Sequence, residues 1–424
     1  MIKSPSKTFV PTRYFMVAGT FLLAMLVLID RIAISVAKDD ISSSLSLSDK
    51  QFGWILSVFA LGYALFQAPS GYLADKFGAR KVLTAVVFLW SIFTIFTGLA
   101  GGFVFLLIVR FLFGCGEAGA FPSISKMIYN WIPMKERGAV NGINFSGGRI
   151  GAAFSLPIIA LVIDRYGWQT TFFVLGFIGI IWALAWYFMY RDSPADHPFI
   201  SEHEVNEIRD AQTTPKQNKA NLPFLDLFKS RIVWLLMAQY FASNFTFFFC
   251  LTWLFPYLKD VYHLSNVETG FYSSIPLLAG ALGNVFSGFL VDFLYNKGMF
   301  RWSRNIVAII GFSLSAIGLV ASLYVNNVQL AVLFLSIAVF GADMTLSPSW
   351  TFCVDIGEQN SGLVSGTMNM AGNIGSFLTA ISFPYLRGWT HSDAYFFYLG
   401  AIFNVLAIVF WLKLNPLKKL TATA

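Results

Sequence analysis

Long apolar runs of about 20 residues recur along the whole chain, and this feature decides what the chain can fold into. A helix needs about 20 apolar residues to cross a membrane, and twelve such runs can be drawn. Only 12% of the 424 residues are charged, about half the roughly 25% that is usual in soluble domains. We therefore predict an all-α membrane protein with spans at 14–37, 51–74, 82–100, 103–128, 139–163, 168–190, 231–258, 270–294, 304–324, 328–352, 362–384 and 394–413.

The twelve predicted spans fall into two groups of six, separated by the only long polar segment. We expect an N-terminal six-helix half at 1–190, a linker at 191–231 and a C-terminal half at 232–424. Within the linker, Ser201 and Glu204 form a predicted capping box ahead of an amphipathic stretch, Val205 to Ala211. The linker is therefore expected to carry a short surface helix.

The positions of the basic residues along the chain indicate the topology of the protein. A formal charge of +7 is compatible with nucleic-acid binding, but in membrane proteins Lys and Arg collect in cytoplasmic loops. Here most of them lie in alternate loops and in the termini. We therefore expect both termini in the cytoplasm and no nucleic-acid partner. The first apolar run lacks a small-residue cleavage site and continues through Asp30 and Arg31, so we expect it to stay in the protein.

The two groups of six also resemble each other in sequence. Seven residues between Gly53 and Asp75 recur 217 positions later, between Gly270 and Asp292. Six residues between Gly138 and Gly151 recur 224 positions later, between Gly362 and Gly375. Repeated halves are typical of transporters with a substrate site between the repeats, near the middle of the membrane.

Several motifs carry a more specific resemblance. The string GYLADKFGARK, from Gly71 to Lys81, resembles the signature loop of the major facilitator superfamily. Within that superfamily, other motifs resemble the anion:cation symporter family: Asp30-Arg31, Arg110, Gly116-Glu117, Phe121-Pro122, and Pro348 followed by Cys353-Val354-Asp355-Ile356-Gly357. That family includes bacterial sugar-acid carriers and relatives of vesicular glutamate and sialic acid transporters. The resemblance implies twelve helices in two pseudo-symmetric halves, alternating access, and a place in a bacterial inner membrane.

The signature loop also suggests gating residues. Asp75 ends the second span, where it can face a helix N-terminus or a basic side chain, and Arg80 and Lys81 follow in the loop. We expect a conformational latch there, although a simple topology anchor remains the alternative. The copy at Asp292 has lost the basic tail and is expected to be weaker, and Asp355 is expected to act as a gate or a topology residue.

Six charged residues lie deep inside the predicted spans, more than two residues from either end, where an unpaired charge costs about 3 kcal/mol or more. Helix register places Asp30 and Arg110 in an outer layer and brings Glu117 near Arg149 in a central layer, while Arg31 cannot be placed. Such pairs can simply fasten helices, but five of the six lie in one half, which fastening alone does not explain. The six are Asp30, Arg31, Arg110, Glu117, Arg149 and Asp343.

These charges suggest a division of roles. Protonating a carboxylate leaves its arginine partner uncompensated and attractive to an anion, so Glu117 is the first and Asp30 the second candidate for proton coupling. Guanidinium groups match carboxylates in shape, so Arg31, Arg110 and Arg149 are candidate substrate ligands. Asp343 is left open as a second titrating group.

The other half offers neutral polar groups instead of charges. These neutral polar groups are Gln239, Asn244, Asn284, Ser347, Asn369 and Asn373. Gln239, Ser347, Asn369 and Asn373 are the candidate partners for substrate hydroxyls, and their alternative role is contact between helices. The aromatic run from Phe245 to Phe249 is expected to face lipid or to pack against other helices.

The sequence predicts a carrier and no catalytic centre. No phosphate-binding loop, zinc spacing or nucleophile with its base can be assembled, so we expect no enzyme, metal or cofactor. We predict a monomeric, proton-coupled importer of an organic anion, by resemblance a hexonate, aldarate or hexuronate; sodium coupling is not excluded. The alternatives are a symporter of aromatic or dicarboxylic acids, a proton-antiporting exporter, or a transporter-like sensor.

Overall fold

The computed structural model describes residues 10–210, 224–264 and 266–420, and in these ranges it contains helices and no strand. The long helices are α1 (Thr12–Val36), α3 (Asp49–Phe77), α4 (Ala79–Gly98), α7 (Arg137–Tyr166), α8 (Trp168–Met189), α10 (Arg231–Thr252), α12 (Asn266–Asn296), α13 (Trp302–Ser322), α16 (Ser361–Thr390) and α17 (Ala394–Lys413). The shorter helices are α2 (Lys38–Ser44), α5 (Phe103–Glu117), α6 (Ala120–Trp131), α9 (Glu202–Asp210), α11 (Leu254–Tyr262), α14 (Val328–Met344) and α15 (Leu346–Gly357).

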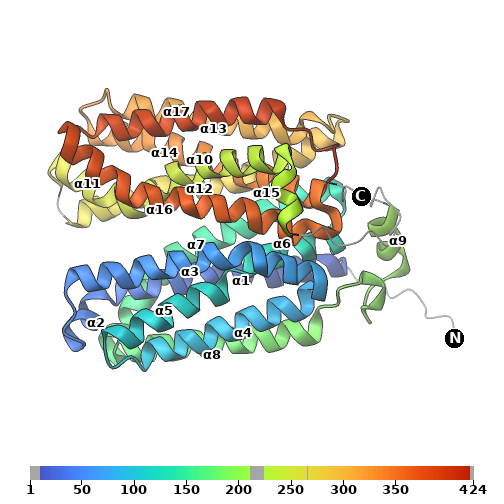
Figure 1. Ribbon diagram of the computed structural model, residues 1–424, viewed down its shortest axis with the longest axis horizontal. Coiled ribbons are helices and arrows are strands. Elements are labelled where there is room, and N and C mark those ends of the chain that lie inside the picture. The colour runs from blue at the N-terminus through green and yellow to red at the C-terminus, as the bar shows by residue number, and fades with distance from the viewer. Residues whose placement is uncertain (1–9, 211–223, 265, 421–424) are drawn as a thin grey trace.

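The helices form two layers that follow the two halves of the sequence (Figure 1). Helices α1 to α8 make one layer and α10 to α17 the other. The layers meet where α3 packs on α16 and α7 packs on α12. These four helices carry the strings that recur in the sequence, so each contact is the internal copy of the other.

Glycines allow the helix backbones to approach each other closely at these two contacts. A Cβ on Gly142 of α7 would lie 2.4 Å from the backbone oxygen of Asn284 in α12, and one on Gly366 of α16 would lie 2.5 Å from that of Gln67 in α3. Real Cβ atoms do not approach an oxygen so closely, so only glycine fits. The predicted duplication is thus visible as two equivalent crossings between the halves.

Nine of the twelve predicted spans form one helix each, and three are broken in two. The broken spans form α5 with α6, α10 with α11, and α14 with α15. In each case proline is the third residue of the second helix: Pro122, Pro256 and Pro348. Proline lacks the N–H that would bond the carbonyl four residues earlier, and that carbonyl lies at or next to the end of the first helix.

Length and composition make ten stretches of the described residues able to cross a membrane. One of them, Val328–Thr379, runs through α14 and α15 into α16. Helix α7 is not among the ten, and its glycines pack against other helices: Gly142 lies against α12, and Gly147 and Gly151 lie against α1. Counting each broken pair once, the described chain crosses twelve times.

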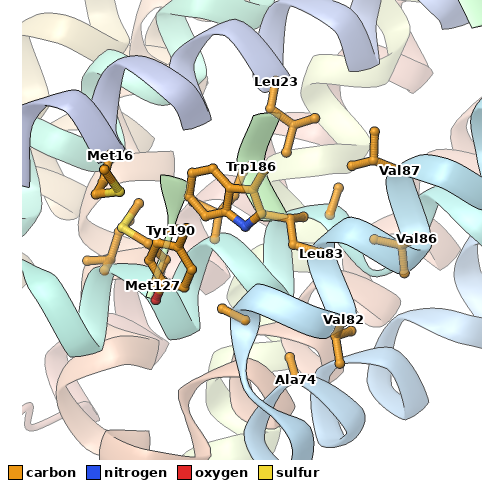
Figure 2. Packing of buried hydrophobic residues seen from close by; sticks show 14 of the residues in the cluster. Met16, Leu23, Ala74, Val82, Leu83, Val86, Val87, Met127, Trp186 and Tyr190 are labelled. Atoms are coloured by element: carbon orange, nitrogen blue, oxygen red, sulfur yellow. The ribbon is translucent and has the colours of Figure 1, made fainter. Parts of the chain in front are cut away.

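The core of the first half is aromatic at its centre. Trp186 and Tyr190 of α8 stack with ring centroids 4.5 Å apart, and Figure 2 shows Met16 and Leu23 of α1 and Leu83 of α4 packed around them. Burying such large side chains stabilises each half by the hydrophobic effect among its own helices. Each half can therefore keep its shape while the contact between halves changes.

The linker helix α9 is docked on the first half. The N–H of Glu204 donates to Ser201 (3.2 Å), which confirms one of the two hydrogen bonds of the predicted capping box. The second predicted bond, from the Ser201 N–H to the Glu204 carboxylate, is wrong, because that carboxylate accepts from the N–H groups of Thr12 (2.9 Å) and Arg13 (2.8 Å) at the start of α1. Ala211 lies outside the described residues. We call the end of the bundle where α9 and the start of α1 lie the linker end.

Candidate functional site

A cavity lies between the two halves, roughly midway along the bundle. Its empty volume is about 750 Å³, including the part that is open to solvent. Helices α1, α3, α6 and α7 of the first half and α10, α15 and α16 of the second supply its walls. The polar and aromatic side chains that line it include Arg31, Tyr63, Phe121, Asn144, Arg149, Tyr240, Ser243, Asn244, Phe247, Trp350, Asn369, Asn373 and Ser376.

Arg31, which the sequence could not place, pairs with Glu117. Its Nε donates to Oε1 of Glu117 (2.6 Å), and its Nη2 lies 2.5 Å from the same oxygen. Glu117 is the last residue of α5, before the break that Pro122 causes, and its side chain is 1% exposed while that of Arg31 is 25% exposed. The cation therefore faces the cavity and the carboxylate lies behind it.

Arg149 has a different partner from the one expected. The sequence placed it near Glu117, but its Nε and Nη2 donate to the two carboxylate oxygens of Asp343 (3.1 and 3.0 Å). Asp343 is 1% exposed and lies one residue before the end of α14, at the break ahead of Pro348. The expected pairing was wrong because register along a helix gives depth but not direction around the axis. Arg149 points across to the other half.

Asp30 and Arg110 lie behind the cavity wall, and neither lines the cavity. Arg110 and Glu117 are the charges that act on Asp30, but no hydrogen bond joins Asp30 to Arg110 among the described residues. The guanidinium of Arg110 lies 4.3 Å from the ring centroid of Phe113 instead. The structure therefore supports proximity of the predicted outer pair without a direct contact, and it does not place Arg110 against a ligand.

Two of the four neutral candidates line the cavity. Asn369 and Asn373 share one face of α16, and the Asn373 amide donates to the Asn369 carbonyl (2.8 Å). Gln239 does not reach the cavity, because its Oε1 accepts from Trp411 (3.0 Å) and Ser349 (3.2 Å) inside the second half.

Ser347 is also away from the cavity. Its hydroxyl donates to the Gly138 carbonyl (2.7 Å), so it fastens α15 to the start of α7.

Some lining residues were not among the candidate ligands, although Asn244 was one of the neutral polar groups considered. Asn144 follows Asn141 by three positions on α7, and Asn244 follows Tyr240 by four positions on α10. A helical spacing of polar residues in otherwise apolar spans is the signal that could have identified them. Phe247 also lines the cavity, with its ring centroid 3.8 Å from the Arg149 guanidinium carbon. Phe245 and Phe249 of the same aromatic run are buried and pack against other helices as expected, whereas Phe247 faces the cavity.

Two aspartates at equivalent positions close the linker end. Asp75 of α3 accepts from the N–H groups of Gly362 (3.0 Å) and Leu363 (2.7 Å) at the start of α16. Asp292 of α12 accepts from those of Gly138 (2.9 Å) and Ala139 (2.6 Å) at the start of α7. A carboxylate is stabilised at a helix N-terminus by the free N–H groups and the helix dipole.

The two aspartate latches differ only in their basic partners. Lys126 lies 3.6 Å from Asp75, whereas the N–H bonds of Asp292 are as complete as those of Asp75. The loss of the basic tail after Asp292 therefore does not remove its helix contact.

Asp355 joins both halves at the same end. One carboxylate oxygen accepts from Arg137 of α7 (2.9 Å), and the other accepts from Arg304 of α13 (3.0 Å). All three side chains are at most 3% exposed. Neither arginine was predicted as a site residue, because the sequence counted both as loop charges.

Arg80 and Lys81 do not join the halves. Arg80 donates to the Tyr187 carbonyl (2.8 Å) and lies over the Tyr187 ring, both within the first half. Lys81 is exposed. Among the predicted gating residues of this loop, the contact with the other half is therefore made by Asp75 and not by Arg80 or Lys81.

The chain is similar in sequence to known membrane transporters. The family model described as Major Facilitator Superfamily matches residues 20–380. The chain is 32% identical to the probable sulfoacetate transporter of Cupriavidus necator, over 96% of this chain and 95% of that protein. It is 33% identical to the hexuronate transporter of Bacillus subtilis, over 92% of each chain. It is 30% identical to the probable galactarate/D-glucarate transporter of Escherichia coli, over 90% of each.

Solved structures share the fold. The proton:xylose symporter bound to 6-bromo-6-deoxy-D-glucose superposes with a TM-score of 0.76 at 16% identity, covering 97% of both chains. The E. coli fucose:proton symporter gives 0.72 at 12% identity, covering 95% of this chain and 99% of that one. The chain belongs to the Major Facilitator Superfamily and is an integral membrane transporter, not an enzyme.

Proposed function

We propose that the protein imports an organic anion of the sugar-acid class together with protons. The observation that carries this proposal is the orientation of the two cavity ion pairs. In each, the arginine faces the cavity and the carboxylate is buried behind it, with side-chain exposures of 25% and 1% for Arg31 and Glu117, and 13% and 1% for Arg149 and Asp343. A ligand therefore meets positive charge first.

The same pairs give a route for coupling. While Glu117 is ionised, it competes with a substrate acid for Arg31. When Glu117 takes up a proton, Arg31 loses its counter-charge and binds the anion more strongly. Anion and proton then favour each other, which is the thermodynamic basis of symport. The neutral amides of Asn369 and Asn373 suit the hydroxyl groups of a sugar acid.

The linker end would be the cytoplasmic end, since basic residues gather in its loops. The contacts of Asp75, Asp292 and Asp355 would then hold the cytoplasmic side closed, and substrate would enter from the opposite side. We place the protein in a bacterial inner membrane as a monomer with both termini in the cytoplasm.

Relatives support the substrate class. The named substrates of three relatives, sulfoacetate, hexuronate and galactarate or D-glucarate, are all small organic anions. The rival function, exchange of a cationic drug for protons, is disfavoured because its site would not present two arginines to the ligand.

A binding screen tests the proposal. A ligand that binds the folded state raises the melting temperature, so purified protein is heated with a panel of sugar acids, other carboxylates, neutral sugars and organic cations. We expect stabilisation by acids alone, followed by uptake of the best acid into proteoliposomes when an inward proton gradient is applied. Stabilisation by cations, or uptake indifferent to the proton gradient, would contradict the proposal.

A further inference from the structure

The two arginines of the cavity are held in similar ways. In both, the buried carboxylate lies on the edge of the guanidinium that carries Nε and Nη2; Asp343 accepts from Arg149 with both oxygens, whereas Glu117 accepts from Arg31 with Oε1 alone. Each guanidinium also lies over an aromatic ring, with its carbon 4.3 Å from the centroid of Tyr63 and 3.8 Å from that of Phe247. The cavity thus contains two copies of one arrangement.

Each arrangement leaves part of the guanidinium for a ligand. A guanidinium carries five N–H donors and can present two of its edges to planar acids. The carboxylates of Glu117 and Asp343 occupy only the Nε side, and both arginines line the cavity. A substrate acid can therefore approach the Nη1 side of either arginine, where it shares the positive charge with the carboxylate behind it and binds more strongly when that carboxylate is protonated.

The two arginines lie at different depths. Helices α1 and α7 both start at the linker end. At about 1.5 Å per residue, Arg31 lies about 28 Å and Arg149 about 18 Å from the starts of their helices. The two positive groups are therefore separated along the bundle axis and cannot both bind one carboxylate in the same way.

Neutral amides lie on the walls of the same cavity. Asn144 of α7, Asn244 of α10 and Asn369 and Asn373 of α16 line it. An amide both donates and accepts hydrogen bonds, as does a hydroxyl. The cavity therefore combines two separate acid-binding groups with a polar wall.

We propose that the preferred substrate is a hydroxylated dianion with an acid group at each end, one bound by Arg31 and the other by Arg149. This inference rests on the proposed function and narrows it. A monoacid of the same length satisfies one arginine and leaves the other without an anionic ligand. Arg149, with Asp343 behind it, then determines the preference for two-ended acids.

A matched pair of ligands tests the inference. Galactonate and galactarate have the same open chain of six carbons and differ at one end, which is a hydroxymethyl group in the first and a carboxylate in the second. By calorimetry on the purified transporter, galactarate should bind about tenfold more tightly or better, the gain expected for one charge-assisted contact. Equal affinities would overturn this inference and leave the proposed function standing, whereas binding of neither acid would overturn both.

Variants assign the preference to the second ion pair. Arg149→Gln combined with Asp343→Asn removes both charges, so no buried charge is left unpaired. In this double variant the ratio of the galactonate and galactarate affinities should fall to about one. Asp343→Asn alone keeps the guanidinium and should keep the preference. A double variant that still prefers galactarate about tenfold would overturn the role of Arg149.

Discussion

Arg137 at the start of α7 and Asp355 near the end of α15 form a buried ion pair, 2.9 Å long, that joins the two halves at the linker end. Arg304 of the second half binds the other oxygen of the same carboxylate. One carboxylate thus compensates two arginines. Because one of these arginines belongs to the other half, separation of the halves must break a bond to Asp355.

The first prediction concerns this closed end. Asp355→Asn leaves Arg137 and Arg304 without a full counter-charge, and breaking a buried pair costs about 3–5 kcal/mol. The closed state should therefore be less populated. Opening can be followed in a chain whose three natural cysteines are replaced by serine and which carries Ser347→Cys. Ser347 is buried at the contact with Gly138, so a cysteine there becomes accessible only when the halves separate. Its labelling by a soluble maleimide should become at least about tenfold faster.

The control for this variant is Asp260→Asn. Asp260 also pairs with an arginine, Arg387 at 3.1 Å, but both side chains are exposed, so its loss should cost at most about 1 kcal/mol. Its labelling rate should match that of the parent. If Asp355→Asn labels no faster than Asp260→Asn, Asp355 does not hold the halves together.

The second prediction concerns orientation. His203 of α9 and Asp40 of α2 are both exposed, and the proposed topology puts the linker end, with its basic loops, in the cytoplasm. In the same cysteine-free chain, His203→Cys should be protected from an impermeant thiol reagent in intact cells and should react after the membrane is permeabilised. Asp40→Cys should react in intact cells. The reverse pattern would invert the proposed topology.

The third prediction concerns acid and the linker helix. Glu207 accepts from Arg13 (2.8 Å) and Lys135 (2.9 Å), and these bonds lower its pKa from 4.5 to about 2. Because the folded pKa is depressed, this stabilisation is complete above the ordinary pKa and is lost as pH falls toward 2.

Hydrogen exchange of the α9 amides measures this effect. Glu207→Gln should exchange faster than wild type at neutral pH, and the difference should shrink below about pH 4.5. Glu202→Gln is the control, because Glu202 is exposed in the same helix. A difference that stays constant down to pH 3 would show that Glu207 does not hold α9 through its charge.

Much of the fold was predictable because a membrane span depends on the total hydrophobicity of about 20 residues and not on any one of them. Apolar run length gave the spans within a few residues, for example 394–413 for α17. The sequence duplication indicated two equivalent helix crossings between the halves. Glycine recurs at Gly142 and Gly366 because a side chain there would clash with the backbone of the facing helix. The helix breaks were missed although Pro122, Pro256 and Pro348 mark them, since a single proline bends some helices and ends others. Pro69 lies inside the unbroken α3.

The site was less predictable because it depends on directions around helix axes. The sequence identified Glu117, Arg31 and Arg149 as intramembrane charges, but their pairing needs the packing angles of α1, α5, α7 and α14. Gln239 was indistinguishable in sequence from Asn369, since both are amides in apolar spans. Only the structure shows that Trp411 and Ser349 bind Gln239 inside the second half.

The fourth prediction concerns Arg149. Arg149→Lys keeps the positive charge but loses the fork that binds both oxygens of Asp343 and an acid on the other edge. Binding of the preferred anion should weaken by about 1–3 kcal/mol, the loss of a charge-assisted hydrogen bond. Calorimetry on the purified variant measures this loss. An unchanged affinity would make Arg149 a structural residue that only links the halves.

The fifth prediction concerns the coupling of anion and proton, which we assign to Glu117 with Asp30 as the second candidate. Glu117 is buried behind Arg31 at the helix break, where its ionised form competes with the substrate for the guanidinium. Glutamine at this position imitates the protonated acid at every pH. The variant should therefore bind the anion without needing a proton. Asp30→Asn, measured in parallel, shows whether the neighbouring acid shares this role.

Uptake into proteoliposomes by the Glu117→Gln variant is the most direct measurement. We predict that the variant exchanges labelled for unlabelled anion across the membrane at a rate near that of wild type, yet fails to accumulate the anion when an inward proton gradient is imposed. Normal gradient-driven accumulation by the variant would contradict the assignment of proton coupling to Glu117.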